Sequence, residues 1–237
     1  MFQYDPFTLI VIFVGLSLLP FVAMVATSYL KIVVVMSLIR NALGIQSIPP
    51  NMVVNALAMV LSFYILAPTC SASWDIIKKE FEARNTPGIQ QTSAPATPAA
   101  ATSRQFDFDT DAIARGAEPF REFLSLHTSD RERAFFVHTA ERLWAKEPDT
   151  PANVDPESFY ILLPSFCVSE LTKAFEIGFL VYLPFIAIDI IVSNILLAMG
   201  MMMVSPVTIS LPFKLLLFVM VNGWTLLIQG LVRGYAL

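Results

Sequence analysis

The sequence predicts an all-α, multi-helix integral membrane protein built from kinked helical hairpins. The first observation is composition: 56% of the 237 residues are hydrophobic, only 14% are charged, and the mean hydropathy is +0.66, whereas about a quarter of the residues in a soluble domain are charged. The second is charge distribution, because 25 of the 34 charged residues lie between residues 74 and 160. The third is length, because the remaining sequence contains four long apolar stretches, and a helix needs roughly 20 residues to cross a bilayer.

The polar segment divides the chain into three parts. Residues 1–72 are expected to form a first helical hairpin, residues 73–160 a polar insert, and residues 161–237 a second hairpin with a methionine-rich loop. The apolar stretches in the two hairpins comprise residues 7–39, 52–69, 177–213 and 215–232. Because Met1 to Pro6 contain no Lys or Arg, the first stretch lacks the basic region of a signal peptide and is interpreted as a retained segment.

Two of the helical patterns are too long for a simple span. The pattern over residues 7–43 would reach about 55 Å as one helix, and Gly44 is expected to close it as a left-handed cap. Residues 165–203 form a second long run. We expect bends in these runs, because a proline frees a backbone carbonyl that protein or water must satisfy. The expected helix breaks are Pro20, Pro184, Gly200 and Pro206.

The polar insert combines a linker with a helical pair. Residues 86–105 are poor in large apolar side chains and are predicted to be a disordered linker. Residues 106–147 are predicted to hold two helices, at 111–126 and 129–147. Their apolar faces contain Phe120, Phe123 and Leu124 in the first helix, and Phe135, Phe136, Ala140 and Leu143 in the second. The pattern therefore predicts a helical pair on a flexible tether.

Basic residues in the short connections predict the orientation in the membrane. Lys31 and Arg40 place the connection between the first two stretches on the inner side, and Lys214 does the same for the connection 200–214. The acidic insert and both termini are then expected on the outer side.

Neither an enzyme nor a nucleic-acid-binding protein is indicated. The net charge of −4 argues against nucleic acid, because phosphate binding needs a surplus of basic residues. The sequence has no phosphate-binding loop, zinc-protease motif or nucleophile elbow, so we expect no catalytic residue, metal or cofactor. His127 and His138 are interpreted as solvated helix residues rather than metal ligands. Cys70 and Cys167 are interpreted as free, packed thiols rather than a disulfide.

Ionisable residues within apolar runs are the more informative charges, because a charge at bilayer depth costs roughly 2.5 to 3.5 kcal/mol. These residues must face protein or water rather than lipid, and they are Lys31, Glu170, Lys173, Glu176 and Asp189. Two interpretations of the series from Glu170 to Glu176 remain open. It forms a ladder along one solvated helix, or it forms ion pairs between identical subunits packed around an axis or pore.

The most unusual local feature is the run Met199-Gly200-Met201-Met202-Met203. It is followed closely by Ser205-Pro206. Methionine is unbranched and polarizable, so it fills irregular gaps and refills them after displacement. A single methionine would be interpreted as one more lipid-facing residue. Three in succession cannot share one helix face, and they predict a loop that projects into a closed space.

Long stretches of the sequence resemble a known family. The first half contains LPFVAMVATSYLKIVVVMSLIRNALGIQSIPPNMVVNALAMVLSFYILAP, and the second contains LPSFCVSELTKAFEIGFLVYLPFIAIDIIVSNILLAMGMMMVSPVTISLPFKLLLFVMVNGWTLLIQGL. Both are similar to the FliP/SctR (YscR/HrcR/SpaP-type) family, the export-gate subunits of bacterial flagella and type III secretion injectisomes. EPFREFLSLHTSDRERAFF also looks like the family's insert, whereas the linker rich in alanine, proline and threonine departs from it. No cleaved leader of the flagellar kind is visible, which favours the injectisome branch.

The resemblance implies a helical or ring-shaped oligomer of about five copies. The copies would assemble in the bacterial inner membrane with SctS/FliQ-type and SctT/FliR-type subunits, and contact SctU/FlhB-type and SctV/FlhA-type proteins. The insert and termini would then be periplasmic. The resemblance also implies that Met201, Met202 and Met203 form a methionine gasket, a ring of flexible side chains that closes the channel.

The favoured function is a core subunit of the type III secretion export gate. With other copies and companion subunits, the chain would form the closed channel through which unfolded substrates cross the inner membrane. One alternative is an ion-coupled secondary transporter in which broken helices surround Lys31 and Asp189. Another is a membrane anchor or scaffold that recruits partners through the helices of residues 106–147. The resemblance favours export over both.

Overall fold

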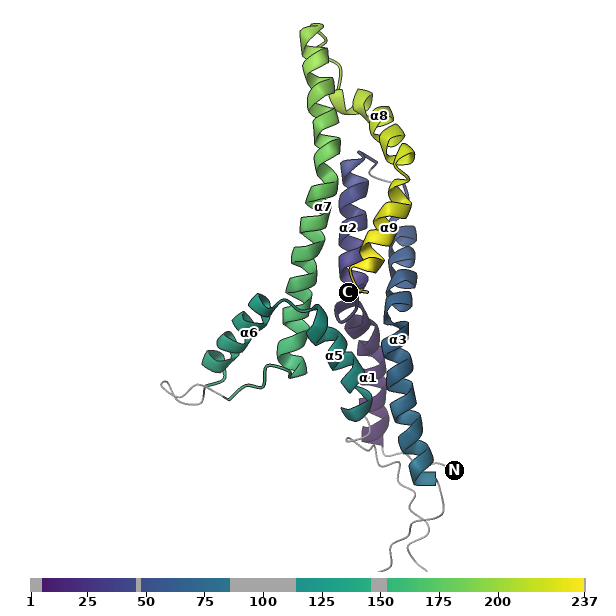
Figure 1. Cartoon of the computed structure of the whole chain (residues 1–237), viewed down its shortest axis with the longest axis vertical. Helices are drawn as coiled ribbons and strands as arrows, with labels where there is room; N and C mark the ends of the chain where they lie inside the picture. The colour runs from purple at the N-terminus through teal and green to yellow at the C-terminus, as the bar shows by residue number, and fades with distance from the viewer. Residues whose placement is uncertain (1–5, 46–47, 86–113, 146–152, 237) are drawn as a thin grey trace, which may run out of the picture.

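The computed structural model describes residues 6–45, 48–85, 114–145 and 153–236, and every regular element in these ranges is a helix (Figure 1). The all-α fold class is thereby confirmed for the described chain. The helices are α1 (Pro6–Val25), α2 (Tyr29–Ala42), α3 (Asn51–Asn85), α5 (Glu118–His127), α6 (Asp130–Leu143), α7 (Phe159–Ala198), α8 (Pro206–Met220) and α9 (Gly223–Arg233). At one end the long helix α7 extends well beyond α2, which lies beside it, and α8 leads back from that end (Figure 1).

The helical pattern over residues 7–43 forms two helices in the structure, α1 and α2, which meet at 55°, so the run is bent as expected but the break lies after Val25 rather than at Pro20. Thr27 explains the break. Its hydroxyl donates to the carbonyl of Ala23 at 2.6 Å and accepts the N–H of Tyr29 at 3.3 Å, so a side chain replaces the hydrogen bonds of a continuous helix. At the other end of α2, Gly44 has a φ of +78°, which confirms the left-handed cap.

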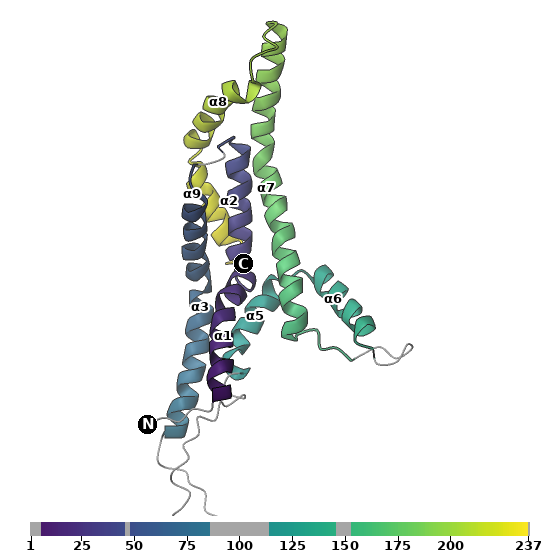
Figure 2. The same ribbon diagram turned by 180° about the vertical axis from the view of Figure 1, so that it is seen from behind.

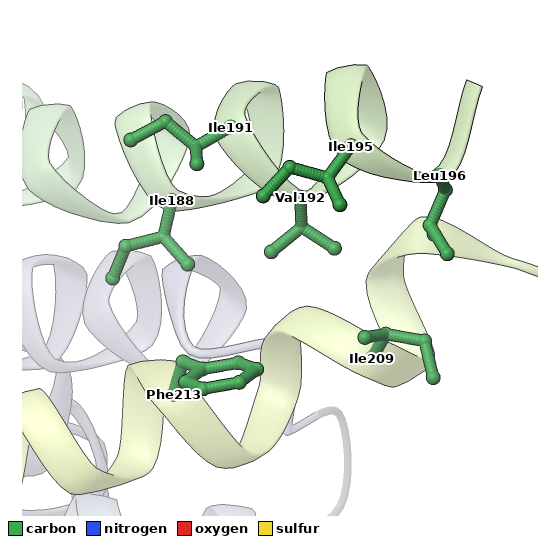
Figure 3. Close-up of a pocket in the computed structure, with 7 residues that line it drawn as sticks. All are labelled: Ile188, Ile191, Val192, Ile195, Leu196, Ile209 and Phe213. Atoms are coloured by element: carbon green, nitrogen blue, oxygen red, sulfur yellow. The ribbon is translucent and has the colours of Figure 1, made fainter. Parts of the chain in front are cut away.

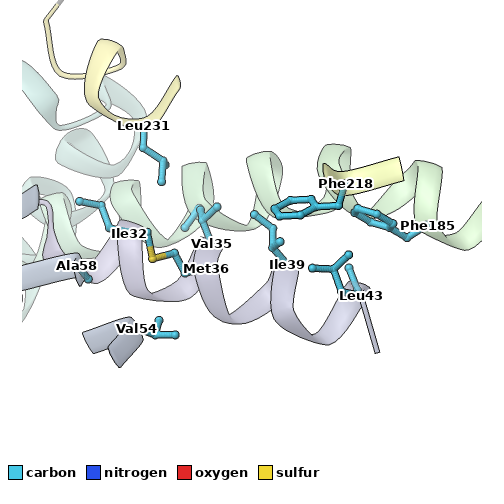
Figure 4. Packing of buried hydrophobic residues seen from close by; sticks show 12 residues of the cluster. Ile32, Val35, Met36, Ile39, Leu43, Val54, Ala58, Phe185, Phe218 and Leu231 are labelled. Atoms are coloured by element: carbon cyan, nitrogen blue, oxygen red, sulfur yellow. The ribbon is translucent and has the colours of Figure 1, made fainter. Parts of the chain in front are cut away.

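One apolar core joins the two hairpins, with α2 at its centre. Helix α2 packs most extensively on α7, and the two approach closely because Gly178 has no side chain. A Cβ on Gly178 would lie 2.3 Å from Cδ1 of Leu38. The face of α2 repeats at helical spacing and meets residues from α3, α7, α8 and α9 (Figure 4); the core includes Ile32, Val35, Met36, Ile39, Leu43, Val54, Ala58, Phe185, Phe218 and Leu231.

The helices do not end at their internal prolines. Helix α1 continues through Pro20 and α7 continues through Pro184, which differs from the breaks expected there. Gly200 and Pro206 do mark an interruption: Gly200 follows α7 with a φ of +74°, and Pro206 is the first residue of α8, where a missing N–H costs least. A second bend, of 59°, separates α8 from α9 at Asn222, a residue type that tolerates the left-handed conformation it adopts here.

The sequence predicts a helical pair that hangs on a flexible tether, but both described helices of the insert pack against the apolar helices. Helix α5 packs against α3 and α7, and its Phe123 and Leu124 are buried with Leu162 and Phe166 of α7. Helix α6 contacts α7 but projects away from the other helices in both views (Figures 1 and 2). The predicted linker 86–105 lies outside the described residues, and α3 ends directly before it at Asn85.

Two described helices, α3 and α7, are long and apolar enough to cross a membrane, and the bent pairs α1–α2 and α8–α9 raise the number to four if each pair is one span. The C-terminal end of α2 and the connection 199–205 lie toward one end of the long axis, and α5 and the start of α1 lie toward the other (Figures 1 and 2). Such apolar helices make the chain a multi-pass membrane protein.

Candidate functional site

The connection between α7 and α8, residues 199–205, has a defined backbone. The N–H of Gly200 bonds the carbonyl of Leu197, and the N–H of the next residue bonds the carbonyl of Leu196, both at 3.0 Å. This pair of bonds is a Schellman motif, which ends a helix with a left-handed residue, usually glycine. The turn leaves three apolar side chains 44%, 81% and 102% exposed; these are Met201, Met202 and Met203 in that order.

In the described part of the chain, no other segment covers these three methionines at the end of α7. Each thioether side chain can adopt many shapes, so the group could fit against several different neighbours. Immediately beside the loop, α7 and α8 form an apolar crevice of about 370 Å³ (Figure 3), lined by Ile188, Ile191, Val192, Ile195, Leu196, Ile209 and Phe213. The closed space expected around the methionines is not formed by a single copy and stays a prediction.

A buried charge cluster, consisting of Lys31, Glu170, Lys173 and Tyr235, connects α2, α7 and the segment after α9. The carboxylate of Glu170 is fully buried and lies 3.5 Å from Nζ of Lys31 and 3.4 Å from Nζ of Lys173. The hydroxyl of Tyr235 donates to the same carboxylate, and Nζ of Lys31 lies 4.3 Å from the centre of the Tyr235 ring. Burial of a carboxylate is tolerated because these donors satisfy it.

A second polar contact joins α7 to α8. The carboxylate of Asp189 lies 2.6 Å from Nζ of Lys214 and accepts the hydroxyl of Ser210 at 2.5 Å. Lys214 is buried and also donates to the carbonyl of Ala42 at 3.1 Å, the last residue of α2, where the helix dipole favours a cation. The contacts of Asp189 and Lys214 therefore connect α7, α8 and the end of α2.

The structure brings together four of the five ionisable residues predicted from the sequence, but in two separate groups and within one chain. Lys31, Glu170 and Lys173 share one cluster, whereas Asp189 belongs to the other. Glu176 is exposed and remains a candidate for a contact between subunits. Sequence reasoning missed three partners: Tyr235, Ser210 and Lys214. Ser210 and Lys214 are four residues apart and therefore lie on one helix face. This spacing was the available sign that both could contact one carboxylate.

The separation of the two groups bears on the transporter alternative. That alternative requires Lys31 and Asp189 to form one coupling site. Lys31 is paired with Glu170 instead, and Glu170 and Asp189 are 19 residues apart on α7, about 28 Å along a helix. Each charge already has a different partner, so the arrangement does not provide the expected site.

The corner between α5 and α6 is also buried in part. His127 was expected on a solvated surface, but its ring contacts the rings of Phe123 and Tyr235, with centroid distances of 4.5 and 5.0 Å. Burial lowers the pKa of His127. His138, on α6, is exposed as expected.

The two cysteines are free in the structure, as expected, but Cys70 is not packed as expected. Cys70 is exposed on α3. The thiol of Cys167 donates to the carbonyl of Val25 at 3.3 Å, the last residue of α1. The thiol therefore satisfies a carbonyl that the break between α1 and α2 would leave without a helical partner.

The fold and these contacts define a class: a multi-pass α-helical membrane protein that pairs its buried charges within the chain and presents a methionine loop at one end. The chain belongs to the FliP family, whose family model matches residues 12–231.

Relatives of this chain carry names from protein secretion and flagellar biosynthesis. The chain is 48% identical over 231 residues to Yop proteins translocation protein R of Yersinia pestis, covering 98% of this chain and 97% of the relative. It is 44% identical to the hypersensitivity response secretion protein HrcR of Ralstonia nicotianae, covering 96% of each. It is 38% identical to the flagellar biosynthetic protein FliP of Pectobacterium carotovorum, covering 95% of this chain and 77% of the relative.

Proposed function

We propose that this chain is a core subunit of a type III secretion export gate in the bacterial inner membrane. Several copies, with SctS/FliQ-type and SctT/FliR-type subunits, form a closed channel for unfolded substrates, and SctU/FlhB-type and SctV/FlhA-type proteins contact it. Membership in the FliP family supports the class of function. The near-complete match to translocation protein R and HrcR, at higher identity than to flagellar FliP, favours the injectisome branch.

The observation that carries the gating role is the exposed methionine loop. A Schellman motif fixes the backbone at the end of α7, so the position of the loop is defined while its side chains stay adaptable. Copies arranged around an axis with these loops inward would place a ring of thioethers in the channel. Such a ring excludes ions and small solutes when closed and parts when a polypeptide enters.

The orientation proposed from the basic connections fits the same arrangement. The connection between the first two apolar stretches, with Lys31 and Arg40, and the connection 200–214, with Lys214, would face the inner side, and the insert with both termini the periplasm. Glu176, exposed on α7, is then available for contacts between neighbouring copies.

The test is to replace Met201, Met202 and Met203 by alanine and to measure ion conductance of the purified complex in planar bilayers. We expect unchanged co-purification with the companion subunits and a clear rise in conductance without substrate. The matched control replaces three other exposed methionines outside the loop by alanine: Met52, Met59 and Met220. An assembled loop variant whose conductance equals that of the control would refute the gasket.

A further inference from the structure

The corner between α5 and α6 is held on α7 by a small number of polar contacts. Nζ of Lys173 donates to the carbonyl of His127 at 2.7 Å. The N–H of Ser129 donates to the hydroxyl of Ser169 at 3.0 Å. The two α7 residues in these contacts, Ser169 and Lys173, lie one helical turn apart. Their partners are His127 and Ser129, so a change at His127 acts directly on the attachment of the insert to α7.

The imidazole of His127 occupies an aromatic site that suits its neutral form. One ring nitrogen, Nδ1, lies 2.8 Å from the carbonyl of Phe123 and can donate to it. The rings of Phe123 and Tyr235 lie 4.5 and 5.0 Å from the imidazole and 6.3 Å from each other, so the three rings form one cluster and the two aromatic neighbours limit the access of water to His127. Protonation adds a charge and a second N–H donor at this position.

Among the described residues, the anion buried beside His127 is Glu170, whereas Glu132 of α6 lies at the surface, within reach of Ser129 and Lys173. On α7, Glu170 already accepts from Lys173, from Lys31 of α2 and from Tyr235. On α3, Ile65 and Leu66 pack against the apolar cluster that contains Phe123. At the corner itself, Arg133 adds a cation that donates to the carbonyl of Ser125, and the neighbouring acid Asp130 is exposed.

We propose that His127 is a pH-sensitive switch that releases the α5–α6 corner from α7 and Tyr235 when it is protonated. A protonated ring would be a third cation beside Lys31 and Lys173, with one carboxylate to share. The released insert would expose Phe123 and the Glu170 cluster to water. The switch concerns the fold of the chain itself and does not depend on the methionine gasket.

The direction of the pH effect follows from linkage. Burial lowers the pKa of His127, and Lys173 and Lys31 act in the same direction, whereas the bond to Phe123 and the charge of Glu170 raise it. A detached corner would restore the ordinary pKa of about 6.5. Because the detached state then binds more protons, the attached state loses stability as pH falls below about 6.5 toward the lowered pKa.

The experiment is hydrogen exchange with mass spectrometry on the purified complex, from about pH 7.5 to about pH 5.5, after correction for intrinsic exchange rates. We expect a severalfold loss of protection in peptides of α5 and the start of α6, and none in α2. The loss should persist in His138→Gln and disappear in His127→Gln. These two histidines are the only ones in the chain, so the pair is a matched control.

A second measurement applies even if His127→Gln does not fold. In the complex carrying His138→Gln, isotope-labelled histidine gives one NMR signal from this chain, whose titration midpoint is the pKa of His127. A midpoint below the ordinary value supports the switch. A midpoint at or above about 6.5 would mean that the aromatic rings and Glu170 hold the imidazolium, and it would overturn the proposal, as would pH-independent protection of α5.

Discussion

Replacing Glu170 by glutamine tests whether the buried charge cluster stabilises the chain. The side chain of Glu170 is 0% exposed and that of Lys31 is 5% exposed, so the substitution leaves a buried cation without its counterion, at a cost of about 3 to 5 kcal/mol. Lys173 is 38% exposed and can turn to water, so its share is about 1 kcal/mol or less. The total is a large part of the roughly 5 to 15 kcal/mol that stabilises a domain.

The assay is reversible unfolding in mixed micelles with increasing SDS, followed by tryptophan fluorescence. Glu176→Gln is the control, because it removes an exposed charge from the same helix and is expected to change the free energy of unfolding by about 0.5 kcal/mol or less. Adding Lys31→Met to Glu170→Gln removes the orphaned cation and should recover most of the loss. A Glu170→Gln chain as stable as the control, or a double variant no better than the single one, would contradict the reasoning.

Two further expectations concern the backbone turn and the helix break. Gly200→Ala places a side chain at a φ of +74° and should cost about 1 to 2 kcal/mol, read as a lower unfolding midpoint; Gly230→Ala, inside α9 with open space around its Cβ, should not lower the midpoint. Ser62→Ala removes a buried hydroxyl that bonds the hydroxyls of Thr27 and Ser28 at the break between α1 and α2, at 2.9 and 3.3 Å. The loss should lower the free energy of unfolding by about 1 to 3 kcal/mol. Ser71→Ala serves as the control, because the hydroxyl of Ser71 is exposed. Equal unfolding midpoints for the two serine variants would show that the Ser62 hydrogen bonds do not stabilise the chain.

Hydropathy and local rules predicted the membrane class and the helix ends that depend on backbone chemistry. The cap at Gly44 and the interruption between Gly200 and Pro206 follow from residues whose φ preferences are strong. The break near Thr27 was missed because threonine is also common inside apolar helices. Its effect depends on a hydrogen bond to Ser62, 35 residues away, which no local pattern contains.

Pairing of the charges was the part that local reasoning could not supply. The sequence indicated that Lys31, Glu170 and Asp189 need partners, because lipid cannot solvate them. It could not identify the partners, since Lys31 and Glu170 meet only after α2 and α7 pack. The position of His127 has the same cause: its helical pattern predicts an exposed face, and Tyr235, from the far end of the described chain, covers it.

The Glu170 cluster imposes an order on biosynthesis. Lys31 and Glu170 are translated long before Tyr235, which follows Glu170 by 65 residues. At about 5 to 20 residues per second, the ribosome needs about 3 to 13 seconds to supply that last hydroxyl. During this interval the Glu170 carboxylate has Lys31 and Lys173 as partners but lacks the hydroxyl of Tyr235, so the charge cluster is completed only after α9 has been synthesised.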